Sequence, residues 1–319
     1  MKVGIVGAGA IGGWIGAKLA AKGSPVSVLA RGATLEAIRA DGLVLHEDGL
    51  TIAAPVAASE NGAELGPQDI LVIAVKEPSL RAAALAAGPM VGPATAIVPM
   101  LNGVPWWFLG DRPALRPDSL DPDDAISASL PADQVIGCVV HASCASPEPG
   151  VVRRHFGKGL ILGEPSGATT DRLARTAALF ADAGLDITTS NRIQQDIWYK
   201  LWGNMTMNPI SALTRATADR ILDDALVAAF TLRIMAEAAE IGAAIGCPIS
   251  QSGEDRMQVT RKLGAFRTSM LQDVEAGRAI EIDALLAAPR AIGERAGIAT
   301  PYMDALLGLT RLFDSNRAL

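Results

Sequence analysis

The sequence predicts an α/β protein in which an N-terminal domain built on a parallel sheet is followed by an all-helical C-terminal domain. Two observations support this prediction. Short β-branched runs alternate with helix-like runs over the first part of the chain, which is typical of a parallel sheet covered by helices. From about Asn191 the pattern is helical almost to the end. The predicted domains are therefore residues 1–190 and 191–319.

Composition limits the partners of the protein. With 319 residues, of which 50% are hydrophobic and 19% charged, the chain has length for about two domains with sizeable cores. Its net charge of -6 and its pI near 5.2 provide no basic surface for a nucleic acid or an anionic membrane. We therefore expect a small molecule as the partner.

The cysteines and histidines show no metal-ligand spacing. Cys138, Cys144 and Cys247 are odd in number and form no CxxC pair, so we interpret them as reduced thiols of a cytoplasmic protein. For His141 and His155 we expect hydrogen-bonded structural roles. No bound metal is expected.

An uncharged run from Ala82 to Leu101 has about the length of a membrane span. Glycines and prolines interrupt it, so it is better interpreted as a helix end, a turn and a buried strand. The N-terminus leads directly into a strand, without the pattern of a signal peptide. We therefore expect a cytoplasmic protein that makes no contact with a membrane.

The segment "KVGIVGAGAIGG" combines a strand, a glycine-rich turn and the start of a helix. Gly7 turns the chain tightly, Gly9 lets the backbone approach a pyrophosphate, and Gly12 brings the helix close to the sheet. The unpaired N–H groups of the helix N-terminus then face the phosphates. This order predicts a Rossmann-type dinucleotide-binding domain. The alternative is a purely structural tight turn.

Arg31 indicates which dinucleotide binds. It ends the second strand, in "VSVLARG", where an NAD site usually has an acidic residue for the ribose 2'-hydroxyl. An arginine at this place favours the 2'-phosphate of NADP. The alternative is an ordinary surface arginine near a strand end.

Two later strands end on polar residues. The runs "DILVIAVK" and "TAIVPMLNG" lead to Lys76 and Asn102, and ligands of open α/β sheets lie beyond the carboxyl ends of the strands. We expect both side chains to contact cofactor or substrate. The alternatives are a solvated loop lysine and a plain Asn-Gly turn.

A Pro- and Asp-rich segment extends from Pro105 to Val135 and is long for a loop. Its aromatic start, Trp106 to Phe108, either covers the cofactor, lines a substrate pocket or packs as core. The runs "VIGCVVHA" and "GVVRRHFGKGLILGE" then predict more strands, the second of them a hairpin.

The helical half begins with a polar stripe on an apolar helix. In "WYKLWGNMTMNPISAL" the residues Lys200, Asn204 and Asn208 follow one another in steps of four, so they share one face over about 12 Å. Burying these groups unpaired is costly, and a polar substrate would be a partner. The alternative is a structural network in which Asn208-Pro209 marks a kink or a helix end.

A second group of polar residues lies in "FRTSMLQDVEAGRAIEIDALL". Ser269 and Asp273 are one helical turn apart, and Glu281 follows a turn expected at Gly277. A carboxylate near Lys200 would keep its ammonium charged, and Lys200 would then be a workable proton donor. The contact is a hypothesis, since Glu281 has the spacing of a surface residue as well.

These motifs together resemble the ketopantoate reductase (2-dehydropantoate 2-reductase) family over nearly the whole chain. The matching pieces are "GAGAIGG", Arg31, "VK" at Lys76, "NG" at Asn102, "KLWGNMTMNP" and "SMLQDVEAGRAIEID". The last two are the specific ones. The resemblance implies NADP(H) as cofactor and a 2-oxo acid as substrate.

The resemblance also implies roles for individual residues. Lys200 and Glu281 are the expected catalytic residues. The expected cofactor-binding residues are Gly7, Ala8, Gly9, Ala10, Ile11, Gly12, Arg31, Lys76, Asn102, Ala142 and Glu281. The expected substrate-binding residues are Lys200, Asn204, Asn208, Arg267, Thr268 and Ser269.

The implied reaction is the NADPH-dependent reduction of 2-dehydropantoate to pantoate for coenzyme A synthesis. Two alternatives stay open: an enzyme of the same family that acts on a different 2-oxo acid or related alcohol, and a non-catalytic NADP(H)-binding sensor. The first depends on three departures from the family pattern. Leu286 and Ala287 stand where the family commonly has Asn-Gly, the segment from Pro105 to Val135 is longer than usual and begins with Trp106-Trp107, and the loop "HASCASPEPG" is expanded. The apolar helical domain is compatible with a homodimer.

Overall fold

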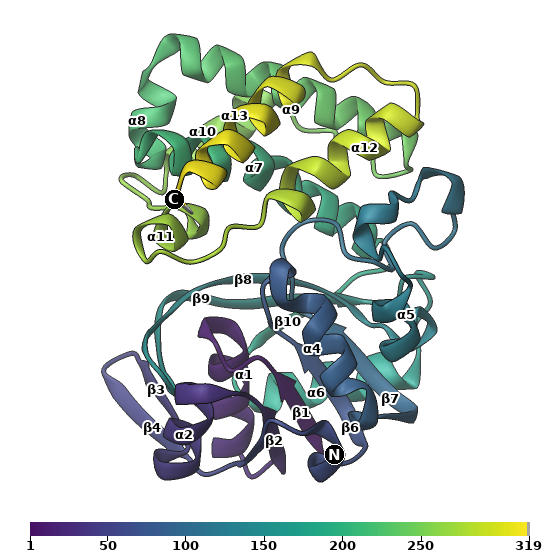
Figure 1. The fold of residues 1–319 in the computed structure, drawn as a ribbon, viewed down its shortest axis with the longest axis vertical. Helices are drawn as coiled ribbons and strands as arrows, with labels where there is room; N and C mark the ends of the chain where they lie inside the picture. The colour runs from purple at the N-terminus through teal and green to yellow at the C-terminus, as the bar shows by residue number, and fades with distance from the viewer. Residues whose placement is uncertain (318–319) are drawn as a thin grey trace. The chain divides into compact units, whose positions relative to one another are not determined.

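The computed structural model describes residues 1–317 and divides into two compact units (Figure 1). Unit 1 consists of Met1–Leu101 and Asp123–Ile193, and unit 2 of Asn102–Pro122 and the chain from Gln194 onward. The first is α/β and the second helical, which confirms the predicted fold class. The short segment Asn102–Pro122 lies within the predicted N-terminal domain by sequence but clusters with unit 2.

Unit 1 contains a five-stranded sheet in the order β5-β2-β1-β6-β7, in which all neighbouring strands are parallel. Its apolar runs are buried, as expected for a sheet with helices on both faces. The strands are β1 (Val3–Val6), β2 (Val26–Leu29), β5 (Ala57–Ser59), β6 (Gln68–Ile73) and β7 (Val91–Pro99).

Helices and short turns connect these strands. They are α1 (Ala10–Ala21), α2 (Gly32–Asp41), α3 (Gly62–Leu65), η1 (Glu77–Ser79), α4 (Leu80–Ala87) and η2 (Gly88–Met90). The uncharged run 82–101 therefore forms the end of α4, the turn η2 and the strand β7, as predicted. No helix within residues 1–317 is both long and apolar enough to cross a bilayer.

A second sheet of unit 1 has the order β10-β9-β3-β4, and β8 pairs with β9. Its strands are β3 (Leu43–Glu47), β4 (Leu50–Ala54), β8 (Gly137–Glu148), β9 (Val151–Gly163) and β10 (Asp186–Thr189). The remaining elements of this unit are α5 (Ala125–Ser129), η5 (Ala132–Gln134) and α6 (Asp171–Asp182).

The predicted hairpin within residues 150–164 is wrong. These residues form the single strand β9, which pairs antiparallel with β8 through a turn at Gly150 (φ +74°). Gly157 does not turn the chain. It lies opposite the register shift between His141 and Ser143, where a Cβ on Gly157 would come within 2.4 Å of the His141 carbonyl oxygen.

Helix α1 packs against strands of both sheets, and small residues make this possible. A Cβ on Gly13 would come within 2.6 Å of Val152 in β9, and one on Gly16 within 2.8 Å of Leu43 in β3. Trp14, on the same helix, is fully buried. A Cβ on Gly16 would also come within 3.3 Å of Ile5 in β1, so α1 is held between the two sheets.

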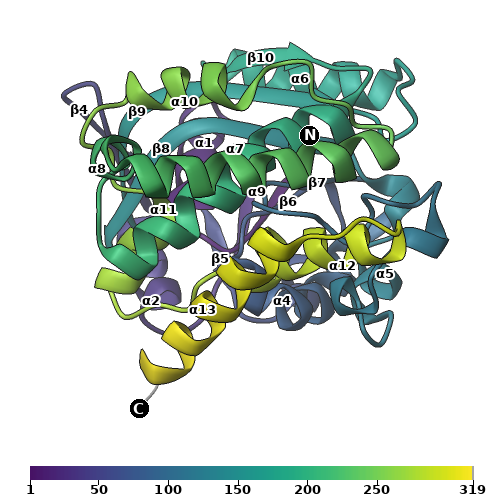
Figure 2. The ribbon, with the colours of Figure 1, turned by 90° about the horizontal axis from the view of Figure 1, so that it is seen from above.

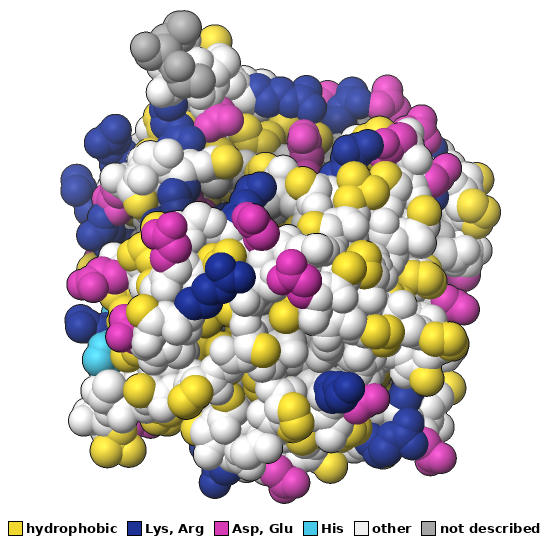
Figure 3. Space-filling view, turned by 60° about the horizontal axis from the view of Figure 1, so that its bottom comes forward, with side chains coloured by type: hydrophobic (Ala, Val, Ile, Leu, Met, Phe, Trp, Pro, Cys, Tyr) yellow, Lys and Arg dark blue, Asp and Glu magenta, His cyan; other side chains and the backbone are white. Residues whose placement is uncertain are grey.

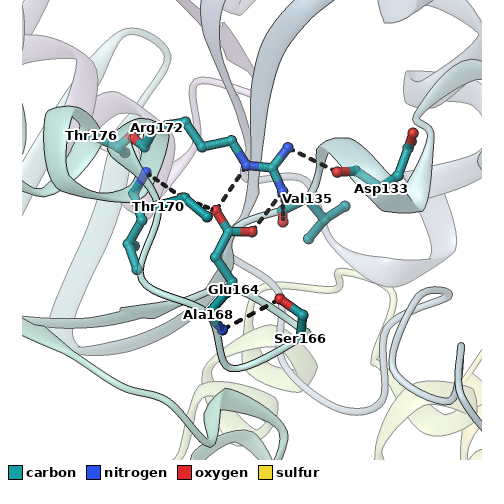
Figure 4. A network of polar contacts seen from close by, with 9 residues as sticks. Asp133, Val135, Glu164, Ser166, Ala168, Thr170, Arg172 and Thr176 are labelled. Atoms are coloured by element: carbon teal, nitrogen blue, oxygen red, sulfur yellow. Dashed lines mark hydrogen bonds and ion pairs between the residues drawn. The ribbon is translucent and has the colours of Figure 1, made fainter.

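A buried carboxylate fastens the end of β9 to α6 (Figure 4). Arg172 donates from Nε to Glu164 Oε1 at 2.8 Å and from Nη2 to Glu164 Oε2 at 2.6 Å. Thr170 also donates to this carboxylate, and Arg172 Nη1 donates to the Asp133 carbonyl at 2.8 Å. Burial alone would raise the pKa of Glu164. The hydrogen bonds from Arg172 and Thr170, together with the charge of Arg172, outweigh this effect, so the pKa lies below its ordinary value.

Unit 2 is built around two long helices (Figures 1 and 2). These are α7 (Ile193–Thr214) and α9 (Ala225–Ala244). The other elements are η3 (Pro113–Leu115), η4 (Asp118–Leu120), α8 (Ala218–Asp223), α10 (Gly253–Arg261), α11 (Ser269–Glu275), the π-helical turn η6 (Asp283–Ala287), α12 (Ala288–Arg295) and α13 (Pro301–Arg317). Pro209 lies inside α7 and does not end it.

The segment Asn102–Pro122 joins unit 2 through its aromatic start. Trp106, Trp107 and Phe108 are buried, and the ring of Phe108 lies 6.2 Å from that of Trp198 in α7. Arg295 of α12 donates to the Arg116 carbonyl further along the segment. Of the roles considered for these aromatics, packing as core is therefore the one observed.

Charged side chains of both signs are interspersed on the face shown in Figure 3. This agrees with the small net charge of -6.

Candidate active site

The glycine-rich turn between β1 and α1 has the geometry of a phosphate site. Gly7 has φ +89°, and a Cβ on Gly12 would lie 2.0 Å from the Gly7 carbonyl oxygen. A Cβ on Gly9, by contrast, would meet no atom within 4 Å, so Gly9 presents its backbone to open space. The turn is therefore closed on the sheet side and open on the side where a pyrophosphate would approach.

The N-terminus of α1 adds to this site. Its N-cap is Gly9, no side chain caps the helix, and its first turn contains no acidic residue. The first N–H groups of a helix lack intrahelical partners and favour an anion. A dinucleotide pyrophosphate thus fits the residues present.

Arg31 lies beside the glycine-rich turn. Strand β2 pairs with β1 through Val6 and Leu29, and the Gly7 N–H donates to the Leu29 carbonyl at 3.2 Å. Two residues later, Arg31 is exposed, and its side chain forms no hydrogen bond or ion pair with the described residues. Its guanidinium is available for an anionic group close to the turn.

Lys76 and Ala142 also belong to unit 1. Lys76 follows β6, the neighbour of β1 on its other side, and is half-buried. Ala142 lies in β8 within the register shift between His141 and Ser143. The fold does not group Asn102 with them, because Asn102 clusters with unit 2.

Two buried tryptophans determine which way the polar stripe of α7 faces. Trp198 and Trp202 face α9, where their indole nitrogens donate to the Ala238 carbonyl at 3.1 Å and the Met235 carbonyl at 2.8 Å. Lys200 follows Trp198 by two residues and therefore points about 200° away on the helix. The tryptophans thus fix the rotation of α7 so that the polar stripe faces away from α9.

The end of the stripe meets α11. Asn208 is 6% exposed, and its Nδ2 lies 3.5 Å from Ser269 Oγ, within range of a long hydrogen bond. Lys200 and Asn204 are half-buried, and Ser269 is exposed. Four polar groups expected from the sequence therefore lie on two adjoining elements of unit 2.

The two residues before Ser269 have local partners. Thr268 is buried and caps α11, with its hydroxyl accepting from the Leu271 N–H at 3.2 Å. Arg267 is exposed and forms an ion pair with Glu275. Thr268 thereby sets where α11 begins and where Ser269 stands.

Glu281 lies on the same unit as the stripe. It is 6% exposed, and the Asn102 amide donates to its Oε2 at 3.3 Å. Next to this contact, the Val104 N–H donates to the Ala284 carbonyl at 3.0 Å. Asn102 therefore joins the helical side of the protein, although it follows a strand of the sheet in sequence.

The thiols are not placed for chemistry. Burial raises the pKa of Cys144 to about 12 and that of Cys247 to about 11, so both remain protonated near neutral pH. Within residues 1–317 no cluster of three or more His, Cys, Asp or Glu side chains is arranged to hold a metal ion.

Comparison with known proteins agrees with this geometry. Residues 3–167 match the family model "Ketopantoate reductase PanE/ApbA", and residues 192–314 match "Ketopantoate reductase PanE/ApbA C terminal". The chain is 42% identical over 316 residues to the 2-dehydropantoate 2-reductase of Mesorhizobium japonicum, covering 98% of this chain and 97% of that protein.

Solved structures show the same similarity. A protein from Ralstonia solanacearum MolK2, provisionally assigned as a ketopantoate reductase, has a TM-score of 0.94 and 53% identity over 99% of this chain and 98% of its own. The PanE/ApbA family ketopantoate reductase of Ralstonia eutropha JMP134 has a TM-score of 0.86 and 28% identity, with complete coverage of both chains.

Proposed function

The chain belongs to the ketopantoate reductase family, and on that basis we propose that it catalyses the NADPH-dependent reduction of 2-dehydropantoate to pantoate, a step of coenzyme A synthesis. The protein is an oxidoreductase that acts on CH–OH groups, and a 2-oxo acid is its small-molecule substrate. The polar stripe of α7, which continues at Ser269 and shares its unit with Glu281, is the observation that supports this function most directly.

We assign the cofactor to the turn after β1. The backbone from Gly7 to Gly12 holds the pyrophosphate, since only Gly9 offers open space there, and Arg31 pairs with the 2'-phosphate. Lys76 and Ala142 complete this side, and Asn102 and Glu281 are the cofactor contacts on unit 2. When bound, NADPH supplies the hydride.

Lys200 is the proposed general acid. Negative charge develops on the substrate carbonyl oxygen during reduction, and the Lys200 ammonium stabilises this charge and gives the oxygen its proton. The proposed role of the Glu281 carboxylate is to keep that ammonium charged. Lys200 and Glu281 both belong to unit 2.

Three of the proposed substrate contacts are uncharged donors. Asn204, Asn208 and Ser269 orient its carboxylate and hydroxyl groups without adding negative charge beside the reacting carbonyl. Arg267 and Thr268 stand directly before Ser269 and line the same site in this proposal. The hydrogen bond between Asn208 and Ser269 supports a shared role for the two elements.

An assay of NADPH consumption tests the function. Purified protein is given 2-dehydropantoate and a panel of differently substituted 2-oxo acids, with NADPH and then with NADH. Fast turnover of 2-dehydropantoate with NADPH supports the proposal. Turnover no faster than that of unrelated 2-oxo acids removes 2-dehydropantoate as the substrate, and absence of any turnover favours an NADP(H)-binding sensor.

One observation keeps a different 2-oxo acid as the second candidate. Leu286 and Ala287, in the π-helical turn five and six residues after Glu281, are buried and apolar. An apolar turn near Glu281 favours a substrate with less polar substituents than 2-dehydropantoate carries. The same panel decides between the two candidates.

We further propose a cytoplasmic homodimer. Tyr302, Leu309 and Leu312 on α13 are exposed by 42%, 56% and 60%, and apolar side chains at such spacing are suited to a second copy of the chain. Light scattering coupled to size-exclusion chromatography tests this; a mass near 33.0 kDa would contradict it.

A further inference from the structure

Arg256 on α10 is a half-buried cation that forms no ion pair with the described residues of the chain. Its Nε is buried and has no hydrogen-bond partner in that part of the protein. Among residues 1–317 its side chain makes one hydrogen bond, a long one in which Nη1 donates to the hydroxyl of Tyr199 at 3.5 Å. Most donors of this guanidinium therefore have no partner among the described residues and are available to a planar anion.

Tyr199 provides a fixed support for this guanidinium. The Arg256 Cζ lies 4.8 Å from the centroid of the Tyr199 ring, a cation–π distance. The Tyr199 hydroxyl donates to Gln251 Oε1 at 2.5 Å, which holds the ring in place. Arg256 is therefore preorganised, and binding a ligand would cost little side-chain entropy.

Gly203 brings the guanidinium close to the polar stripe. A Cβ at Gly203 would lie 2.9 Å from Arg256 Nη2 and 3.1 Å from Nε, so the absence of a side chain makes room for the guanidinium against α7. Gly203 follows Lys200 by three residues and directly precedes Asn204. Residues three apart on a helix are neighbours, with about 5 to 6 Å between their Cβ atoms.

We propose that Arg256 is a specificity-determining residue that binds a carboxylate group of the substrate. Carboxylates match the fork of an arginine, and an arginine stacked on an aromatic ring is favoured for such pairs. The inference rests on the proposed function for the identity of the substrate as a 2-oxo acid. It adds a charged partner to the uncharged donors on α7 and α11.

The test compares substrates with and without the carboxylate. Arg256→Gln is assayed with 3-methyl-2-oxobutanoate, its primary amide and the diacid 2-oxoglutarate, with NADPH saturating. We expect kcat/KM for at least one acid to fall by about tenfold to a hundredfold, mainly through KM, while the amide is unaffected. Loss with both acids assigns Arg256 to the carboxylate beside the ketone, and loss with the diacid alone to a distal one.

Two further variants control for charge and folding. Arg233→Gln removes an exposed arginine of α9 and should behave as wild type with every substrate. Gly203→Ala displaces Arg256 while keeping its charge, and alanine favours the helix, so this variant is expected to fold. Gly203→Ala should lower kcat/KM for the acids as Arg256→Gln does. Arg256→Lys, which keeps the charge but loses the planar fork, should lower it less.

The proposal is overturned if Arg256→Gln and Gly203→Ala match wild type with all substrates, or if they impair the acids and the amide equally. A binding measurement separates this outcome from failure of the proposed function. Calorimetry without cofactor compares 2-hydroxy-3-methylbutanoate and the dianion of 2-hydroxyglutarate with their amides. If the wild type turns over no 2-oxo acid but binds an acid in an Arg256-dependent way, the function fails and this inference stands.

Discussion

Asn102 and Glu281 are 179 residues apart in the chain, and the Asn102 amide donates a hydrogen bond of 3.3 Å to Glu281 Oε2. This contact lies entirely within unit 2. A residue that follows the last strand of the parallel sheet is thus held by the helical part of the protein. Asn102 thereby belongs to the same unit as the polar stripe of α7.

Gly103→Ala is predicted to disturb this contact. Gly103 has φ +79°, and a Cβ there would come within 2.4 Å of the Ala284 carbonyl oxygen. We expect a loss of about 1 to 3 kcal/mol in the free energy of unfolding, together with a lower kcat. Urea denaturation and steady-state kinetics measure the two effects.

The matched control is Gly110→Ala in the same segment. A Cβ at Gly110 would approach only the Trp107 carbonyl oxygen, at 3.5 Å, and its φ is not positive. Its stability and turnover should stay within error of wild type. If the two variants behave equally, the close approach of Gly103 to Ala284 contributes neither to stability nor to turnover.

Lys200→Ala is predicted to separate cofactor binding from chemistry. Removing a positioned general acid lowers turnover by about 10² to 10⁴-fold, whereas the dinucleotide site on unit 1 stays intact. Fluorescence titration with NADPH and an assay of 2-oxo acid reduction measure the two properties. Retained turnover would exclude Lys200 as the proton donor.

Arg31→Ala is predicted to weaken NADPH selectively. The side chain is exposed and has no partner among residues 1–317, so its removal should leave stability unchanged. The KM for NADPH should rise by about tenfold or more, while the KM for NADH changes little. Arg175→Ala, an exposed arginine of α6, is the control for charge, and an equal rise for both cofactors would contradict the assignment of Arg31 to the 2'-phosphate.

Because Glu164 is paired with Arg172, we predict that the free energy of unfolding falls at acidic pH. The pKa of Glu164 is lowered in the folded state, so below its ordinary value of 4.5 the unfolded chain binds more protons than the folded one. The stabilisation is present above pH 4.5 and is lost as the pH falls through the folded-state pKa.

Glu164→Gln tests this dependence. At neutral pH we expect it to be less stable than wild type by about 2 kcal/mol, because Arg172 loses its charged acceptor. Urea denaturation between pH 7 and pH 3 should show the difference shrinking below pH 4.5. A constant difference across this range would mean that Glu164 is not the titrating group.

Part of the candidate site was predictable from local spacing. The order of strand, glycine-rich turn and helix is written in residues 3–21, and the stripe on α7 follows from steps of four on a helix. Both depend on contacts between residues close in sequence. The second sheet was not predicted, because β3 pairs with β9, which lies far away in the sequence, and because β9 was interpreted as two strands divided by its glycines.

The sequence by itself determined the parallel-sheet and helical halves, the glycine-rich turn after the first strand and the residue types of the polar stripe. The tertiary structure decided which elements carry these groups together: it joined Asn102 to Glu281, packed Trp106 to Phe108 into unit 2, and set Arg256 on Tyr199 beside Gly203. The physical reason is that periodicity reports local backbone geometry, whereas these contacts form between side chains 50 to 180 residues apart, whose meeting depends on how whole helices pack.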